Sequence, residues 1–409
     1  MHKKITSIRN NFSDFIDFLI RERRLPSRLT HNLFWQSYSF YNQQIKNKVK
    51  SINSEDFVLI NLPHLRHRYI YQILHLFHLA YPQVAFFWDF SLDNYIKLGN
   101  EGRRLFSILN LKIISNLSTQ LKPSTFVSPE DSQNLKFQAI NPKLKVIINT
   151  DLSQKAKEES LLIPYSVHPH FLQNYKGFNQ EILQLRSNYR EISIFFAGNI
   201  QNLGDKHLVE RFYNVPSRDR CIQFLLKSSE ELNIYVISDA RFRRNMFSLK
   251  NEWSQYSAVI CICKGLPQKW LFELSSANFF LALPGGYMLM CHNVIEAMAV
   301  GTIPILCYED WFSPNLVHGE NCLTYKTLDE IPDLIKLANS MNQNEIERMR
   351  GAVINYYEHY LNPSKIADFI KSYKGSNLNL YINHEDADTL REVTDDSILR
   401  TGGTLQSLL

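Results

Sequence analysis

The residues with the clearest chemical potential lie between positions 284 and 296. Pro284-Gly285-Gly286 makes a loop of small residues, and a helix with His292 and Asn293 near its start follows it. Such a loop lets a ligand approach the backbone N–H groups of a helix N-terminus, where the dipole favours phosphate. Glu296 stands one to two turns into this helix, where a carboxylate can accept from ribose hydroxyls. The alternatives are a plain tight turn for the glycines and a helix-surface glutamate.

The surrounding elements would form a strand, loop, helix and strand. The apolar run at 279–283 predicts a buried strand. Gly301 stands where a left-handed cap ends a helix, and residues 302–306 start the next strand. The apolar face of the helix comes from Val294, Ile295, Met298 and Ala299.

This segment resembles the donor-sugar-binding signature of the GT-B glycosyltransferases, most closely that of the exostosin family. The matching parts are a serine pair, a short strand, a Pro-x-Gly loop, a Glu-Ala pair and a Gly-x-Ile-Pro sequence, here residues 275–276, 279–283, 284–286, 296–297 and 301–305. Asn293 replaces the family's arginine, and Thr302 replaces its cysteine. Met288 stands where the retaining GT-B pattern has a second glutamate, so the resemblance implies an inverting enzyme.

The resemblance covers about residues 190–330. It implies an α/β protein of the GT-B fold, with two Rossmann-like domains facing a cleft and a C-terminal helix crossing back to the first domain. It also implies a nucleotide-diphosphate sugar as donor substrate. GT-B enzymes usually stabilise the departing diphosphate with helix N-termini and basic side chains, so we expect no cofactor and no metal site.

The resemblance also points to other donor-site residues. It places the loop Gly198-Asn199 opposite the donor phosphates and puts Ser275 in the serine-bearing segment. His292 and Asn293 would bind phosphate through neutral hydrogen bonds where the family has arginine.

Basic side chains are the remaining donor-site candidates. Arg218 and Arg220 come first, because exostosins have an arginine before a helix in this region. The others are Arg241, Arg243, Arg244 and Lys264. For each of them the alternative is a solvated surface charge.

Inversion requires a base that takes the acceptor proton. Asp89 ends the predicted strand 84–90, and Glu130 follows the predicted strand 124–127, so both could face the cleft from strand ends. His168 is a third candidate, at the crossing between the domains. The alternative for each is a local cap or turn.

Chain length and the alternation of elements predict two domains. A chain of 409 residues is long for one core. A helix at 101–117 would belong to the first domain, and Asn362-Pro363 would cap and start a late helix. The predicted parts are a basic N-terminal helical segment at 1–50, an acceptor domain at 51–187, a donor domain at 188–342, crossing helices at 343–372 and an acidic tail at 373–409.

Positive charge gathers at the N-terminus. Residues 1–50 have ten Lys or Arg and three Asp or Glu, a balance of +7, whereas the whole chain has +5. This basic amphipathic segment could lie on an anionic membrane surface, or pack on the first domain with a solvated basic edge. Basic residues and aromatics are not interleaved as in a nucleic-acid-binding module, so we expect no nucleic acid partner.

The remaining composition favours a cytoplasmic protein, with peripheral contact at the inner face of the membrane as an option. No run reaches the roughly 18 apolar residues of a spanning helix, and the N-terminus lacks a signal-peptide core. The six cysteines lack zinc-like spacing, since Cys261-x-Cys263 has no second pair, and are expected to be structural or free thiols.

Two classes of function remain open from the sequence. The first is an inverting transferase that adds a sugar to a glycan or lipid-linked acceptor in polysaccharide synthesis. The second is a catalytically inactive GT-B protein that binds a nucleotide sugar or a partner, which the Asn293 departure permits. A sugar-nucleotide epimerase of the same fold is a further possibility among enzymes.

Overall fold

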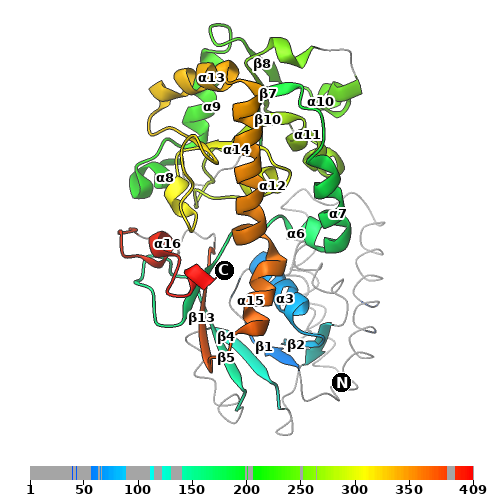
Figure 1. Ribbon diagram of the computed structural model, residues 1–409, viewed down its shortest axis with the longest axis vertical. Coiled ribbons are helices and arrows are strands. Elements are labelled where there is room, and N and C mark those ends of the chain that lie inside the picture. Colours follow the sequence, from blue (N-terminus) through cyan, green and yellow to red (C-terminus); the bar gives the residue numbers. More distant parts are fainter. Residues whose placement is uncertain are drawn as a thin grey trace, which may run out of the picture. The chain divides into compact units, whose positions relative to one another are not determined.

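A computed structural model describes residues 39, 43, 57–62, 65, 67–88, 111–114, 122–129, 141–198, 200, 206–248, 252–263, 265–384 and 392–408. The chain divides into two compact units, Met1–Val146 and Ile147–Leu409. The division falls inside strand β5 (Leu144–Asn149). Parallel strands with interspersed helices make up two sheets, so the predicted α/β class is confirmed (Figure 1). The domain boundaries predicted from the sequence stay predictions.

The first unit contains a parallel sheet in the order β3-β2-β1-β4. Its core consists of apolar side chains of these strands, among them Leu59, Ala85 and Phe126. The strands predicted at 84–90 and 124–127 are confirmed as β2 and β4, with bounds that differ by a few residues. The elements are β1 (Val58–Ile60), α3 (His67–Ala80), β2 (Val84–Phe87), β3 (Leu111–Ile114) and β4 (Thr125–Pro129).

One predicted helix of this unit is wrong where the structure describes it. The prediction covered 101–117, but residues 111–114 form strand β3, in which Leu111 pairs with Val84 of β2. A short apolar run fits a buried strand as well as a helix, and the β-branched pair Ile113-Ile114 favours the strand. The rest of the predicted helix lies outside the described residues.

The second unit contains a six-stranded parallel sheet in the order β12-β11-β10-β7-β9-β8. Strand β7 comes first along the chain, β8 and β9 follow on one side of it, and β10 begins the other side. The strand order therefore reverses between β7 and β10, where sheets of this kind bind ligands at the carboxyl ends of their strands. The strands are β7 (Ile192–Ala197), β8 (Ile234–Ile237), β9 (Ala258–Cys261), β10 (Ala277–Leu281), β11 (Ile303–Leu306) and β12 (Leu323–Thr324).

Helices flank this sheet, and the long helix α14 passes beside α12 before the chain continues into α15 (Figure 1). A π-helical turn, Tyr357–Leu361, joins α14 to α15. The predicted cap of α15 is confirmed, since the Asn362 side chain accepts from the N–H of Ser364 at 3.0 Å and Pro363 is the first helical residue. Among the described residues of the second unit, the α-helices of at least six residues are α7 (Tyr175–Leu185), α8 (Lys206–Tyr213), α9 (Arg218–Lys227), α10 (Ala240–Asn245), α11 (Trp270–Ser275), α12 (His292–Ala299), α13 (Ile331–Ser340), α14 (Gln343–Tyr356) and α15 (Pro363–Ser372).

The region predicted as a tail contains regular structure. Strand β13 (Asn377–Ile382) pairs in parallel with β6 (Ser160–Ile163), and α16 (Ile398–Thr401) follows. Leu378 and Leu380 are fully buried. The sequence prediction weighed the acidic overall charge of the segment and overlooked the alternating apolar residues of β13. The prediction of a tail is therefore wrong for these residues.

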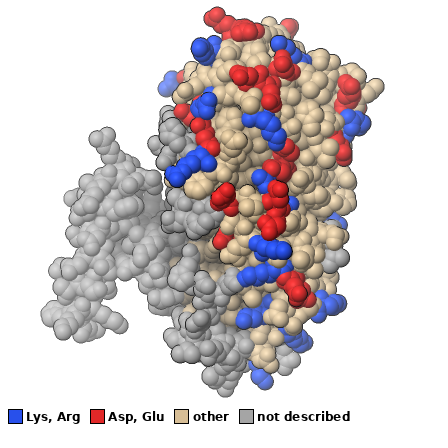
Figure 2. All heavy atoms as spheres, turned by 90° about the vertical axis from the view of Figure 1, so that its left-hand side faces the viewer, with Lys and Arg blue, Asp and Glu red and all other residues tan. Residues whose placement is uncertain are grey.

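The surface of the described part has mixed charge. Figure 2 shows Lys and Arg interspersed with Asp and Glu over one face. The basic segment at 1–50 lies outside the described residues except for two isolated positions. Within the described part of the chain, no helix has the length and hydropathy needed to span a membrane.

Candidate functional site

Two loops follow the neighbouring strands β7 and β10, at which the strand order reverses. Gly198 follows β7, and Pro284-Gly285-Gly286 follows β10 and leads to α12. The Asn293 side chain of α12 points back to β7, with its Nδ2 at 3.5 Å from the carbonyl oxygen of Ala197. A Cβ on Gly198 would lie 3.6 Å from the same nitrogen. The fold thus places Gly198 beside Asn293, and Gly285 and Gly286 follow the strand that pairs with β7, so these four predicted residues lie at the same edge of the sheet.

The N-terminus of α12 is partly exposed. Cys291 at the N-cap makes no side-chain capping bond, and His292 and Asn293 are half-buried. From Val294 to the helix end every residue is buried. The positive end of the helix dipole therefore lies where a ligand can reach it, while the body of the helix belongs to the core.

The other end of α12 is firmly held. Gly301 has φ +75°, its N–H donates to Met298, and the N–H of Thr302 donates to Ala297 at 2.9 Å. These two bonds make a Schellman motif, so the predicted left-handed cap is confirmed. Arg190 also donates to the Val300 carbonyl at 2.6 Å, and its burial beside Arg350 lowers the pKa of Arg190 to about 9.

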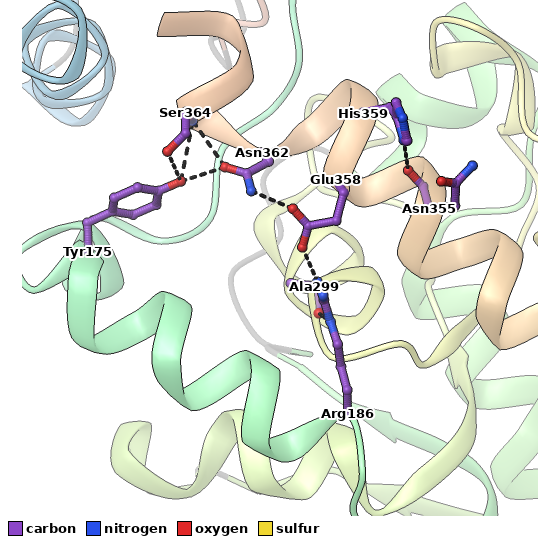
Figure 3. A network of polar contacts seen from close by, with 8 residues as sticks. All are labelled: Tyr175, Arg186, Ala299, Asn355, Glu358, His359, Asn362 and Ser364. Carbon is purple, nitrogen blue, oxygen red and sulfur yellow. Dashed lines mark hydrogen bonds and ion pairs between the residues drawn. The ribbon is translucent and has the colours of Figure 1, made fainter. Parts of the chain in front are cut away.

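A polar network fastens the same helix end to α7 and α15 (Figure 3). Arg186 donates through Nε to the Ala299 carbonyl at 2.9 Å and pairs with Glu358 at 2.6 Å. Glu358 also accepts from Asn362 at 2.7 Å, and Asn362 accepts from the Tyr175 hydroxyl at 2.6 Å. Cations beside the last carbonyls stabilise a helix through its dipole. The result is an α12 that is rigid at its C-terminus and accessible at its N-terminus.

The Arg218 side chain is hydrogen-bonded to the glycine loop, Pro284–Gly286. Only 8% of this residue is exposed. Its guanidinium donates to the carbonyls of Pro284 at 2.8 Å and Leu283 at 3.3 Å, and lies 3.7 Å from the sulfur of Cys291. The predicted cation is therefore next to both the loop and the start of α12. It adds a buried positive charge at the dipole's positive end.

Glu296 is fully buried, with 0% exposure. Its two oxygens accept from the backbone N–H of His168 at 2.7 Å and from the indole N–H of Trp270 at 2.5 Å. Burial raises the pKa of Glu296 to about 8, although both hydrogen bonds act in the opposite direction. The predicted contact with a ribose stays a prediction. In this structure the carboxyl oxygens are hydrogen-bonded to the His168 N–H and the Trp270 indole instead.

His168 lies against the start of α12. Its ring centroid is 5.2 Å from that of His292, in an edge-on arrangement. The Nδ1 atom of His168 accepts from the N–H of His170 at 3.1 Å. In the neutral ring the proton is then on Nε2, which makes this nitrogen a hydrogen-bond donor. The prediction that His168 is the base stays a prediction, and its geometry favours a donor role.

Other predicted residues lie away from this centre. Arg220 has a 60% exposed side chain and pairs with Glu210 at 3.4 Å. Ser275 is buried at the end of α11, where it accepts from the Asn188 amide at 2.9 Å. Arg243 is buried in an ion pair with Glu273 at 2.5 Å, and Arg241 and Arg244 are exposed. Four predicted residues lie outside the described part of the chain: Asp89, Glu130, Asn199 and Lys264.

Sequence reasoning missed the residues that support the site. Trp270 contacts Glu296 from 26 positions away, and Arg190 reaches the end of α12 from before β7. No motif marks either residue, because each acts through a contact that exists only after the chain folds.

The cysteines and possible metal ligands suggest no further centre. None of the six cysteines forms a disulfide, and burial raises the pKa values of Cys221, Cys261, Cys307 and Cys322 to about 12. Buried thiols of high pKa are inert. Among the residues that the structure describes, no three His, Cys, Asp or Glu side chains are grouped to hold a metal ion.

Several solved structures are similar to this chain. They include sucrose-phosphate synthase from Thermosynechococcus elongatus, with 12% identity, TM-score 0.41 and coverage of 78% of this chain and 97% of that one. HepE from Anabaena in complex with UDP has 10% identity, TM-score 0.38 and coverage of 77% and 98%. The β-glucosyltransferase of phage T4 has 11% identity, TM-score 0.34 and coverage of 77% and 98%.

No protein-family model and no curated protein matches the chain. TM-scores below 0.5 do not establish a shared fold, so the description of the fold and of the site comes from this chain alone.

Proposed function

We propose that this protein is a glycosyltransferase of the GT-B type, related to the exostosins, that transfers a sugar from a nucleotide-diphosphate sugar to a glycan or lipid-linked acceptor. One observation carries the proposal: the N-terminus of α12, the Pro284–Gly286 loop and buried Arg218 converge where the strand order reverses. Backbone N–H groups, a helix dipole and a guanidinium together suit a diphosphate.

In this proposal the site stabilises the departing diphosphate. Gly198, Gly285 and Gly286 give the phosphates close access to the backbone, and His292 and Asn293 supply neutral hydrogen bonds. Arg218 is already oriented by two carbonyls, so it need not reorganise as charge develops on the leaving group. We propose that no resident metal ion is needed for this step.

An inverting reaction also needs a base on the acceptor side, for which we propose Asp89 or Glu130. They follow β2 and β4, which flank β1 in one parallel sheet, so these two strands end at the same edge. His168 is less suited, because its hydrogen bond with His170 leaves the ring proton on Nε2. In this proposal D89N or E130Q abolishes transfer without affecting nucleotide binding.

A second candidate is a protein of the same kind that binds a nucleotide sugar without turnover. Asn293 favours it, because a neutral amide at the helix start replaces the arginine of the exostosin pattern. In either case the acceptor could be lipid-linked, with residues 1–50 contacting the inner face of the membrane. Sedimentation with anionic vesicles, before and after removal of residues 1–50, tests that contact.

The test is a thermal-shift and calorimetric screen of UDP, GDP, ADP and CDP and their sugars, with and without Mg²⁺. A ligand at a hundred times its Kd stabilises the folded state by about 2.7 kcal/mol. Binding followed by transfer or slow hydrolysis of the sugar supports the enzyme, and binding alone supports the second candidate. If no nucleotide binds, both are wrong.

A further inference from the structure

Positive charge gathers at the C-terminal end of α12, away from the end proposed for the diphosphate. Arg190 donates to the Val300 carbonyl at 2.6 Å. Arg350 of α14 donates to the backbone carbonyl of Arg186 at 2.7 Å, and the Arg186 side chain donates to the Ala299 carbonyl at 2.9 Å (Figure 3). Three arginines therefore converge on the turn that ends this helix, and we call them the arginine cluster.

The same turn brings two of these side chains close to each other. A Cβ on Gly301 would lie 2.9 Å from the Ile354 side chain and 3.6 Å from the Arg190 guanidinium. Ile354 and Arg350 are four residues apart, so they share one face of α14. Burial and the nearby charge of Arg350 lower the pKa of Arg190 to about 9, because the two guanidinium groups repel each other.

The positive charge of the cluster exceeds what its protein neighbours offset. Arg186 is paired with Glu358 at 2.6 Å. Among the residues that the structure describes, no carboxylate is within ion-pair distance of Arg190 or Arg350, although exposed Glu347 attracts Arg350 from farther away. Three arginines and one glutamate leave a net charge of +2. The C-terminus of a helix has about half a negative charge, which offsets only about a quarter of this excess.

Two hydrogen-bond donors of the cluster lack acceptors. Within the described part of the chain, the Nε–H groups of Arg190 and Arg350 are buried and have no partner. A buried donor without an acceptor is costly, so two of them beside an excess positive charge point to an anionic ligand. Both side chains as a whole are half-buried, which leaves an approach from solvent. The fork of donors on a guanidinium matches the oxygens of a phosphate group.

We propose that the arginine cluster, Arg186, Arg190 and Arg350, binds a dianionic phosphate group at the C-terminal end of α12. The helix has eight residues, so this site is about 12 Å from the helix start and does not depend on the proposed function. A bound dianion offsets the excess charge and supplies acceptors for the two Nε–H groups. Inorganic phosphate, phosphate esters and lipid headgroups share this chemistry, and the half-buried position favours a small soluble molecule.

The test is a calorimetric titration with inorganic phosphate at constant ionic strength. In R350Q the affinity for phosphate should fall at least about tenfold, because charge-assisted hydrogen bonds are lost. R350K keeps the charge and should retain part of the affinity. The matched control is R348Q. Arg348 is exposed on the same helix and donates to the Gly319 carbonyl, so R348Q should bind phosphate as the wild type does.

N293D separates this site from the start of α12, where phosphate can also bind. It places a negative charge at that end and should leave the phosphate binding that depends on Arg350 unchanged. Hydrogen exchange gives a readout that needs no arginine variant: in N293D, phosphate should slow exchange in residues 186–190 and 347–354. Vesicles with phosphatidic acid test the source of the phosphate. Their binding to wild type and not to R350Q would assign it to a lipid and overturn the soluble ligand.

Each outcome supports or overturns the inference. Equal phosphate affinity in wild type and R350Q would mean that the cluster only caps the helix, and the proposed function would be unaffected. Slowed exchange confined to residues 285–293 of the wild type would place phosphate at the donor site alone and also overturn the inference. If R350Q loses phosphate affinity while no nucleotide binds to the wild type, this inference stands and the proposed function is wrong.

Discussion

Raising the pH through the titration of Glu296 should destabilise the folded chain. Burial raises the pKa of this carboxyl to about 8, from 4.5 when unperturbed. Between these values the folded state keeps the proton that the unfolded state has lost. Unfolding then releases a proton, so the free energy of unfolding falls as the pH rises. The contribution is fully present below pH 4.5 and is lost as the pH rises through 8.

The size follows from the difference between the two pKa values. With a pKa of about 8 in the folded state and 4.5 in the unfolded state, and 1.36 kcal/mol for each pH unit between them, the contribution is at most about 5 kcal/mol. The slope near neutral pH should therefore approach 1.4 kcal/mol per pH unit, roughly that of one proton. His168, His292 and Tyr357 lie near the carboxyl or interact with it. All three are present in both wild type and E296Q, so the difference between the two proteins reports mainly on Glu296.

The assay is urea unfolding of wild type and E296Q at pH 5, 6, 7, 8 and 9. The wild type minus E296Q difference in unfolding free energy should fall steadily from pH 5 to pH 8 and level off at pH 9. Substituting E347Q, on the exposed side of α14, controls for the loss of an acidic residue as such. A difference that stays flat from pH 5 to pH 8 would refute the reasoning, because Glu296 would then ionise as if solvated.

Substitutions at three further residues test the supports of the site. R218K keeps the positive charge but loses the two guanidinium hydrogen bonds to the carbonyls of Pro284 and Leu283, and should lower the free energy of unfolding by about 1–2 kcal/mol. R218A should lower it by about 3–5 kcal/mol and remove most of the nucleotide affinity. Urea unfolding and calorimetry check both, and unchanged binding in R218A would contradict the account. G301A should lower stability by about 1–2 kcal/mol in thermal unfolding, since φ is +75° and the new Cβ would lie 2.9 Å from Ile354. Y175F removes the hydroxyl contacts with Asn362 and Ser364 and should lower the free energy of unfolding by about 1–2 kcal/mol. An unchanged melting temperature would mean that water replaces these hydrogen bonds without loss.

Local patterns made the core of the second unit predictable. The strand, loop, helix and strand around residues 277–306 follow from apolar runs broken by Pro and Gly, and Gly301 and Asn362-Pro363 mark helix ends through their own backbone preferences. These signals are local, so one sequence is enough to find them. The glycine loop and the start of α12 were found for the same reason.

Contacts between distant segments could not be predicted. Strand β3 was taken for part of a helix because a four-residue apolar run has no decisive period, and β13 was hidden in an acidic segment. Glu296 looked like a surface or ligand residue, since nothing in its neighbourhood reveals donors from His168 and Trp270. Likewise, only the folded structure reveals that Arg218 is buried against the glycine loop, whereas the side chain of Arg220, two positions later, is exposed.

The central claim is that a diphosphate binds at the N-terminus of α12, and one pair of charge variants tests it most directly. Calorimetric titration with the best-binding nucleoside diphosphate should show affinity lowered at least about tenfold in N293D and raised in N293R, because the change in charge lies beside the phosphates. N293D should melt close to the wild-type temperature, since an acid in the first turn stabilises a helix and offsets the loss of the weak contact between the Asn293 amide and the Ala197 carbonyl. Equal affinity in wild type, N293D and N293R would contradict the claim and place the nucleotide elsewhere.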